Sequence, residues 1–395
     1  MELTLNVLRG VVEKDAAIRR VQRLQPVGGP GDKIFPPTYP GEGKNAPARH
    51  VFETRRINGQ DVRCVLIDSV QSQANRLEEA LLSLVHAGKM TLPHIVVDFT
   101  DQKTPQGGNL NDLGSITSFD APHRVFDAII RDSEFNGTKF TDTDYYRNLT
   151  RSKPSNALQV FMLSPTSLVF GVWNSTGEGG GLGAKFTRCV VSEIIGVSAV
   201  EGQKGAVRVD PLGIRAAVKV VGGPLDWTIA KGERGEKRVK PSEINHSNII
   251  SNLVPGGVTI DHALHTSVIS CAGLRRLRFP DKDALAGQTV LASIALVALT
   301  EQDKSGYALR SRCDLVCDGS KPFEIVHPDG STQECEIDAD RAINIFDDSV
   351  TAAKKAGFPW NEEPISLKPQ RRLVELVALS RAKALAGESE SDDNE

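Results

Sequence analysis

The segment VRCVLIDSVQSQANRLEEALLSLV, residues 62–85, decides the fold class, because a strand in it leads directly into a helix. Residues 62–67 are rich in β-branched and other apolar residues, which predicts a buried strand. Asp68, with Gln71 three positions later, has the spacing of a helix N-cap pair. The helix is predicted to continue to about residue 85, because apolar residues recur at intervals of three and four: Val70, Ala74, Leu77, Leu81 and Leu84.

The rest of the chain alternates between strand and helix patterns. Strands are predicted at residues 94–99, 168–173, 323–326 and 333–337, the last two joined by the turn signal HPDG. Helices are predicted at residues 122–132, 144–151, 156–163, 338–356 and 369–386, and a helix leading into a strand at residues 283–300. We therefore expect an α+β fold, with helices on one face of an antiparallel sheet.

The charge is unevenly distributed along the 395 residues, although the net charge is only −3. The last eight residues, ESESDDNE, carry five acidic groups and no basic one. Between Lys204 and Lys240, nine Lys and Arg residues stand against four Asp and Glu. Arg275, Arg276 and Arg278 form a second basic cluster. Basic clusters on a nearly neutral chain indicate a polyanionic partner, and a solvated surface is the alternative.

The sequence carries no membrane or secretion signal, so we expect a cytoplasmic protein. The longest apolar run, residues 290–299, is about half of the ~20 residues that a membrane helix needs. The N-terminus contains acidic residues and has no continuous apolar region. Six scattered cysteines are then expected to be reduced thiols. We expect no metal or other cofactor, although a zinc site is conceivable at Cys313, Cys317, His327 and Cys335.

A glycine-rich segment, residues 177–186, reads GEGGGLGAKF. It is not a nucleotide-binding P-loop, because Ala184 and Phe186 occupy the places of the required Gly and Ser or Thr. Glycines do allow backbone N–H groups to approach a phosphate closely. The candidate phosphate contacts here are Gly181, Gly183, Lys185 and Arg188, and a purely structural turn is the alternative.

The helix predicted after residue 68 presents a polar face beside its apolar stripe. Ser72, Asn75 and Arg76 share this face because they are three and four residues apart. A helix N-terminus with short polar side chains and an arginine suits a phosphodiester backbone, whereas a capped surface helix is the plainer interpretation. His123 and Arg124, at another predicted helix start, are a similar case. Neither spacing nor any known motif supplies a catalytic partner, so we expect a binding protein and not an enzyme.

Four segments together resemble one family. They are CVLIDSVQSQANRLEEAL (64–81), HRVFDAIIRDS (123–133), SPTSLVFGVWNSTGEGGGLGAKFTRCVVSEIIGVSAV (164–200) and VRVDPLGI (207–214). They look like the Cas-seven type backbone protein of type I-G CRISPR systems, the Csb-one family within the RAMP superfamily. The resemblance covers the chain from about residue 20 through the closing helices.

The resemblance implies a modified RNA-recognition-motif palm, a ferredoxin-like sheet with helices, that carries a thumb-like arm. Residues 1–200 would form the first part of the palm with a Pro/Gly-rich loop, 201–260 the basic thumb, 261–387 the completed palm with its closing helices, and 388–395 an acidic disordered tail. Only 5% of the residues are aromatic, so recognition is expected to depend on backbone and shape and not on base stacking.

The resemblance also implies the partners. Such subunits assemble head-to-tail along a guide RNA (crRNA) and present it to a target DNA strand, together with a large subunit, a fused Cas-five and Cas-six type subunit, and a helicase-nuclease recruited later. The guide-contacting helix of related proteins maps to Gln71, Ser72, Asn75 and Arg76. The competing function is an RNA-cleaving or RNA-processing nuclease that uses His123 or Asp98. A scaffold that contacts only proteins is a third alternative.

Overall fold

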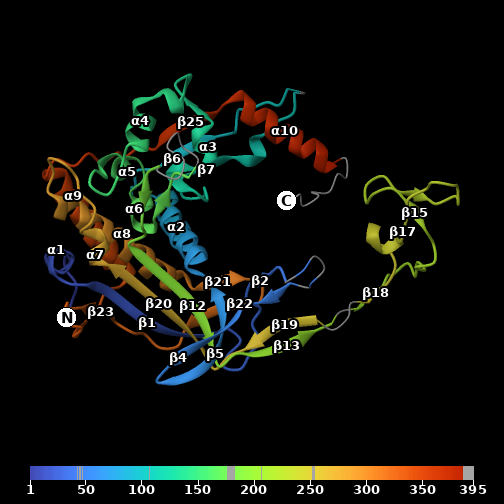
Figure 1. The fold of residues 1–395 in the computed structure, drawn as a ribbon, viewed down its shortest axis with the longest axis horizontal. Helices are drawn as coiled ribbons and strands as arrows, with labels where there is room; N and C mark the ends of the chain where they lie inside the picture. Colours follow the sequence, from blue (N-terminus) through green and yellow to red (C-terminus); the bar gives the residue numbers. More distant parts are fainter. Residues whose placement is uncertain are drawn as a thin grey trace.

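A nine-stranded antiparallel sheet forms the base of the molecule (Figure 1). The computed structural model describes residues 1–41, 43, 46, 48–105, 107–175, 183–205, 207–250 and 254–385. The strands of the sheet are β1 (Ala17–Pro26), β4 (Phe52–Ile57), β5 (Gln60–Asp68), β12 (Val190–Val197), β20 (His262–Ser270), β21 (Tyr307–Arg310), β22 (Cys313–Cys317), β23 (Phe323–Val326) and β24 (Thr332–Cys335). The expected α+β class is confirmed.

The centre of this sheet has the topology of an RNA-recognition motif. In chain order, the units are β1, α2, β12, β20, α8 and then β22 and β23, which both pair with β1. In space β1 lies between β20 and the last strands, and β20 lies between β1 and β12. This is the 4-1-3-2 strand order of a ferredoxin-like βαββαβ unit. A hairpin, β4 and β5, extends the sheet beyond β12.

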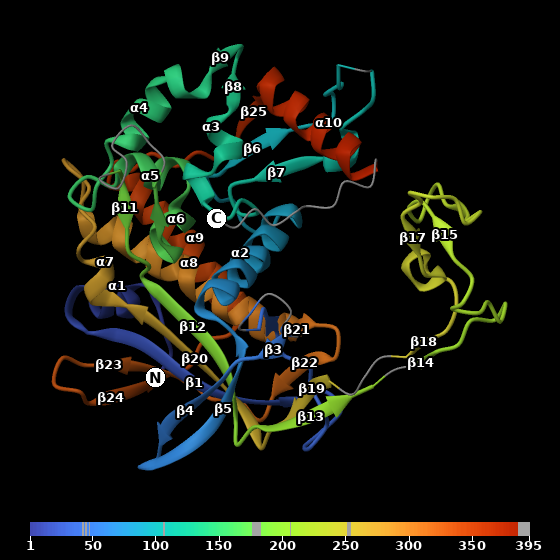
Figure 2. The same ribbon diagram turned by 45° about the vertical axis from the view of Figure 1, so that its right-hand side comes forward.

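Helices cover one face of the sheet (Figures 1 and 2). They are α1 (Leu5–Lys14), α2 (Val70–His86), α5 (Leu158–Leu163), α6 (Pro165–Phe170), α7 (Cys271–Leu274), α8 (Ala284–Ser305) and α9 (Ala339–Lys355). The longest, α8, contacts α1, α2, α6 and α9. It is apolar on all sides, as a fully surrounded helix must be. Among the described residues it is the one helix long and apolar enough to cross a membrane, but most of it is buried inside the protein.

A second, five-stranded sheet lies on the far side of the helices (Figure 1). Its strands are β6 (Ile95–Asp98), β7 (Ser115–Thr117), β8 (Ser133–Phe135), β9 (Thr138–Lys139) and β25 (Ile365–Pro369). Helices α3 (Ala128–Arg131), α4 (Asp144–Thr150) and α10 (Arg371–Leu385) accompany it. The parallel pairing of β25 with β6 brings the closing segment of the chain onto the middle segment.

An arm, residues 200–259, connects β12 to β20 and projects from the body in both views (Figures 1 and 2). Its base is the ribbon of β13 (Val200–Lys204) and β19 (Val254–Thr259). The distal part contains β14 (Val207–Arg208), β15 (Val220–Val221), β16 (Thr228–Ile229), β17 (Arg238–Val239), the short helix η5 (Pro241–Ile244) and β18 (Ile249–Ile250). The arm is thus an insertion between two neighbouring central strands.

Smaller elements complete the described chain. They are β2 (Thr38–Tyr39) paired with β3 (Arg49–His50), β10 (Val172–Trp173) paired with β11 (Lys185–Phe186), and the 3₁₀ turns η1 (Asn111–Leu113), η2 (Arg124–Phe126) and η3 (Phe140–Asp142). The acidic segment 388–395 lies outside the described residues.

Three local predictions were wrong. The segment 168–173 is mostly the helix α6 with Pro165 at its start, and only its last two residues form β10. A short apolar run fits a buried helix as well as a strand. Residues 283–300 contain no strand, because α8 continues to Ser305 and the next strand, β21, begins at Tyr307. The helix predicted at 122–132 is broken into η2 and α3 by Asp127, whose carboxylate caps α3.

Candidate nucleic-acid interface

The N-terminal half of α2 is held in place by its own cap. The cap is Ser69, one residue after the predicted Asp68, and its hydroxyl accepts the backbone N–H of Ser72. Gln71 and Asn75 are exposed on the polar face, while Leu77 and Leu81 are fully buried on the other. The two polar side chains are four residues apart and can therefore contact the same ligand.

Arg76 fixes α2 to the neighbouring edge of the sheet. Its Nε donates to the Asp68 carboxylate at 2.9 Å, and its Nη2 donates to the carbonyl of Leu309 on β21. Asp68 is buried and also accepts from Gln73 at 2.7 Å. These contacts give Arg76 a structural role. Its side chain is still 23% exposed, so part of it remains open to solvent.

Two arginines that the sequence analysis did not select follow Leu309, the backbone partner of Arg76. Arg310 and Arg312 flank the turn between β21 and β22, and both are exposed. Neither makes an ion pair within the described residues, and Arg312 stacks over Phe35 at 4.9 Å. Arg310 and Arg76 both act electrostatically on the buried Cys313. The pattern LRSRC, two arginines in a predicted turn, is the signal that could have identified them.

Arg124 is engaged in a buried ion pair. Its guanidinium donates to both oxygens of Glu78 at 2.7 Å, and also to the carbonyl of Gly171 at 2.9 Å. The side chains are 11% and 1% exposed. The neighbouring His123 is exposed. The guanidinium of Arg124 therefore holds Glu78 and Gly171 in place, and its contact with RNA stays a prediction.

The glycine-rich segment is only partly described. Gly181 lies outside the described residues. At Gly183, a Cβ atom would lie 2.2 Å from the carbonyl oxygen of Asn174, so this position requires glycine. Lys185 is exposed and its ammonium lies over the ring of Trp173 at 5.1 Å. The close backbone approach that the glycines allow is therefore used within the protein, where Gly183 packs against the backbone of Asn174.

Arg188 differs from Arg76 and Arg124 in having no side-chain partner among the described residues. It is half-buried, and it makes no hydrogen bond or ion pair through its side chain within the described residues. Burial lowers the pKa of its guanidinium, and the nearby Arg124 lowers it further. A desolvated cation beside a second cation gains most from a bound anion. Among the selected residues, Arg188 therefore has the charge and the surroundings that favour a bound anion most.

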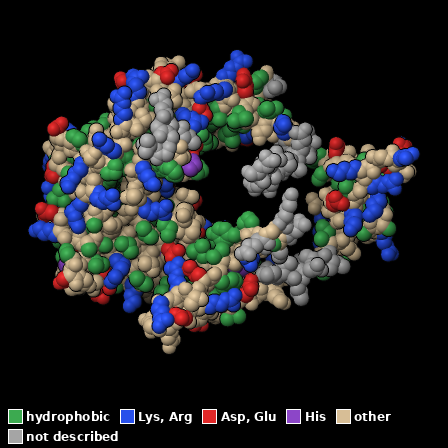
Figure 3. All heavy atoms as spheres, in the orientation of Figure 1, with side chains coloured by type: hydrophobic (Ala, Val, Ile, Leu, Met, Phe, Trp, Pro, Cys, Tyr) green, Lys and Arg blue, Asp and Glu red, His purple; other side chains and the backbone are tan. Residues whose placement is uncertain are grey.

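The acidic and basic side chains of the arm differ in their contacts. Its carboxylates cap turns by accepting backbone N–H groups, as the contacts of four residues show: Asp210, Asp226, Glu236 and Glu243. Six of its cations make no ion pair with described residues: Arg215, Lys219, Lys231, Arg234, Lys237 and Lys240. The arm stands across a wide hollow from the body (Figure 3). Its free positive charges are therefore available to a polyanion.

A buried polar network joins β12, β20 and β21. Ser192 lies 2.6 Å from His265 Nε2, and His265 Nδ1 lies 3.0 Å from the hydroxyl of Tyr307. A serine beside a histidine is the arrangement of a nucleophile and its base. Here both residues are fully buried, and burial lowers the pKa of His265 to about 3, with Arg20 adding to the shift. No substrate can reach this pair, so it links the sheet to α2 and α8.

Asp98 is one of the residues that could serve a nuclease. Asp98 ends β6 and accepts bonds from the N–H and hydroxyl of Thr100, which lower the pKa of its carboxyl group. Over the described ranges, no group of three or more His, Cys, Asp or Glu side chains could hold a metal ion. His262 and His265 lie on the strand β20, not on a helix, and three positions along a strand place them on opposite faces.

Sequence comparison agrees with part of the inferred relationship. Residues 18–201 match the model of the family described as CRISPR-associated protein GSU0053. This part of the chain is similar to CRISPR-associated proteins. The matched residues extend from β1 to the start of the arm and include α2 and the glycine-rich segment. No curated protein matched the sequence.

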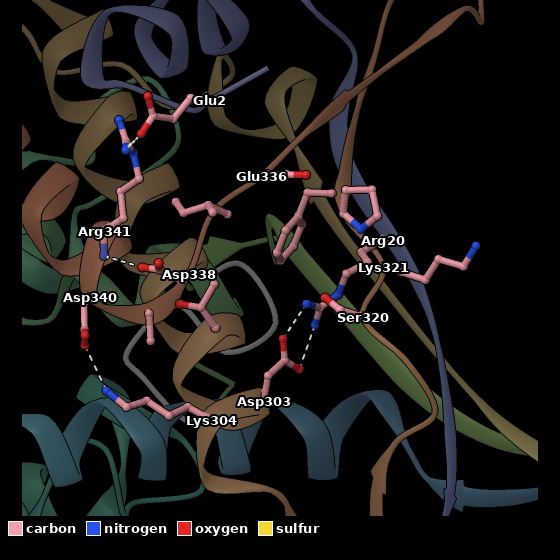
Figure 4. A pocket seen from close by; sticks show the side chains of 15 residues that line it. Glu2, Arg20, Asp303, Lys304, Ser320, Lys321, Glu336, Asp338, Asp340 and Arg341 are labelled. Carbon is pink, nitrogen blue, oxygen red and sulfur yellow. Dashed lines mark hydrogen bonds and ion pairs between the residues drawn. The ribbon is translucent and has the colours of Figure 1, made fainter.

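A cleft of about 790 Å³ lies elsewhere, between α8, α9 and the β23–β24 hairpin (Figure 4). Its charged side chains pair with one another: Arg20 with Asp303, Lys304 with Asp340, and Arg341 with Glu2. Such a cleft offers no excess positive charge to a polyanion. Among the described residues, unpaired cations lie instead on the β21–β22 turn and the arm, and open polar side chains lie on α2.

Proposed function

We propose that this protein is a guide-RNA-binding backbone subunit of a type I-G CRISPR surveillance complex. The observation that carries the proposal is the arm, inserted between β12 and β20 of an RNA-recognition-motif sheet. Four of its acids accept backbone N–H groups in turns, and most of its cations make no ion pair with described residues. A single-stranded polyanion can lie between arm and body, with its phosphates near the unpaired cations of both.

The side chains facing the RNA suit a sequence-tolerant binder. The candidate surface on α2 offers an amide pair, Gln71 and Asn75, and the β21–β22 turn offers two free arginines. These groups bind phosphate and sugar, which position a strand without reading its sequence. A subunit that carries any guide must bind in this way and leave the base edges free for a target DNA strand.

Repeated copies are part of the proposal. The arm contacts little of its own body beyond the ribbon at its base (Figures 1 and 2), and it carries exposed apolar side chains, including Leu212 and Leu225, 72% and 84% exposed. A heterologous head-to-tail contact would cover such a surface, and it repeats until the RNA ends. We propose the large subunit and the fused Cas-five and Cas-six type subunit as the proteins at the ends, and no RNA or DNA cleavage by this chain.

The double change Gln71→Ala with Asn75→Ala is expected to weaken RNA binding about tenfold, because two neutral hydrogen bonds to the RNA are lost. Both residues are exposed and make no described contact within the protein, so the fold should be unaffected. Since no charge is removed, the dependence of affinity on salt should not change. Filter binding of a guide-length RNA at several salt concentrations measures both quantities.

The matched control is Gln333→Ala, an exposed glutamine on β24. It should bind like the wild type. If the double variant also binds like the wild type, α2 is not part of the RNA surface, and RNA cleavage by the wild-type protein in the same samples would favour the nuclease function instead.

A further inference from the structure

A small cavity of about 230 Å³ opens between α2, the end of α8 and β21. It adjoins the proposed RNA face of α2. Gln71, Asn75 and Glu79 are all exposed and follow one another at intervals of four residues, so they form one stripe, about 12 Å long, that leads into the cavity. The wall on the helix side consists of Arg76, Glu79, Ala80 and Ser83.

One side chain of the cavity lacks a partner. Gln302, in the last turns of α8, is only 5% exposed, and its Oε1 has no hydrogen-bond partner within the described residues. A buried, unpaired amide oxygen costs about 1–3 kcal/mol. The cost is recovered when the amide turns so that this oxygen faces the cavity and a bound molecule donates a hydrogen bond to it.

The other polar groups of the cavity define what such a molecule must offer. Arg76 uses Nε and Nη2 within the protein and has Nη1 left as a donor. The Glu79 carboxylate makes no ion pair within the described residues and is an acceptor. A phosphate does not fit, because Glu79 would repel its charge and because it has no N–H group to donate to the amide oxygen of Gln302. The apolar part of the lining, Ala80, Ala308 and Leu309, suits a flat face.

We propose that this cavity binds a single nucleobase, unstacked from the RNA that lies along α2. A nucleobase is flat and carries both donors and acceptors on its edge. An amide can present either its oxygen or its nitrogen, so Gln302 and Arg76 accommodate more than one base. This inference rests on the proposed RNA-binding function and assigns one contact within it.

The test uses guide-length RNAs with one 4-thiouridine at successive positions, bound to the full chain and irradiated. Crosslinked peptides are identified by mass spectrometry. Crosslinks are expected at some positions only, in the segments 76–83 and 302–309. Gln302→Met keeps the shape of the side chain and removes its hydrogen bonds, so it should reduce these crosslinks at least fivefold, with about threefold loss of total affinity. Gln333→Met, exposed on β24, should change neither.

Other outcomes overturn the assignment in distinguishable ways. RNA that binds normally but crosslinks only elsewhere excludes the cavity and leaves the proposed function intact. Absence of RNA binding overturns both. The base could also come from a free nucleotide, and calorimetry with cytidine and adenosine monophosphates tests this. If a free nucleotide binds in a Gln302-dependent way and RNA gives no crosslink in the cavity, the cavity binds a small molecule. A protein–protein crosslink into the same segments assigns it to a neighbouring copy.

Discussion

Replacing Arg124 with Met is expected to lower the free energy of unfolding by about 3 kcal/mol at pH 8. The guanidinium is the ionic partner of Glu78, which is 1% exposed. Its removal leaves the carboxylate buried without a counterion, and it also removes the donor to the carbonyl of Gly171. Urea unfolding followed by circular dichroism measures the change.

The loss should be smaller at pH 5. Burial raises the pKa of Glu78 to about 7, and Arg124 opposes this shift. Because the folded-state pKa lies above the unfolded-state pKa, the folded protein holds a proton on Glu78 at pH 5 and loses it as the pH rises through about 7. The ion pair that the variant lacks therefore exists in the wild type only at the higher pH, and losing Arg124, which lowers this pKa, keeps the carboxyl group of the variant protonated to a still higher pH.

Two further variants complete this experiment. Combining Arg124→Met with Glu78→Leu removes both charges and should restore part of the stability. Arg56→Met, in an exposed pair with Asp61 on the β4–β5 hairpin, should unfold like the wild type. An equal loss at both pH values, or no loss at all, would contradict the structural role of the pair.

Neutralising four cations of the arm is expected to reduce RNA affinity by roughly 10²–10³-fold at 0.1 M salt. The variant is Lys231→Ala, Arg234→Ala, Lys237→Ala and Lys240→Ala combined, at exposed positions without described ion pairs. If each cation meets one phosphate, the slope of log affinity against log salt falls by about 2.8. Filter binding from low to high salt gives both values.

The control removes the same charge from the body: Lys139→Ala, Lys153→Ala, Lys321→Ala and Lys355→Ala, all exposed. This variant should keep most of the affinity and of the slope. Should the two variants lose affinity equally, the arm has no special part in binding, and attraction by overall charge explains the result.

Much of the fold could be predicted because local patterns and tertiary packing agree in it. The stretch 62–85 gives a strand and a helix with caps within one residue of those observed, since its apolar stripe coincides with the face that packs on the sheet. The hairpin of β23 and β24 follows from its turn. The helix α6 could not be predicted, because residues buried on all sides show no period.

The candidate site was predictable in part, for a related reason. The sequence places Gln71 and Asn75 on an open helix face, and they are exposed. It cannot show that Arg124 would meet Glu78, 46 positions away, because that contact depends on the packing of η2 against α2. Nor does it show that β21, which ends at Arg310, lies beside α2. These contacts come from strand order, which short-range patterns do not determine.

The most direct test of the central claim is the mass of complexes reconstituted on guide RNAs of stepped length, measured by native mass spectrometry. If the protein is a backbone subunit that assembles head-to-tail, particle mass should rise in increments of one 42.7 kDa chain as the RNA is lengthened. Assembly should require RNA and weaken as salt rises. A fixed dimer or closed ring at every RNA length would contradict the account.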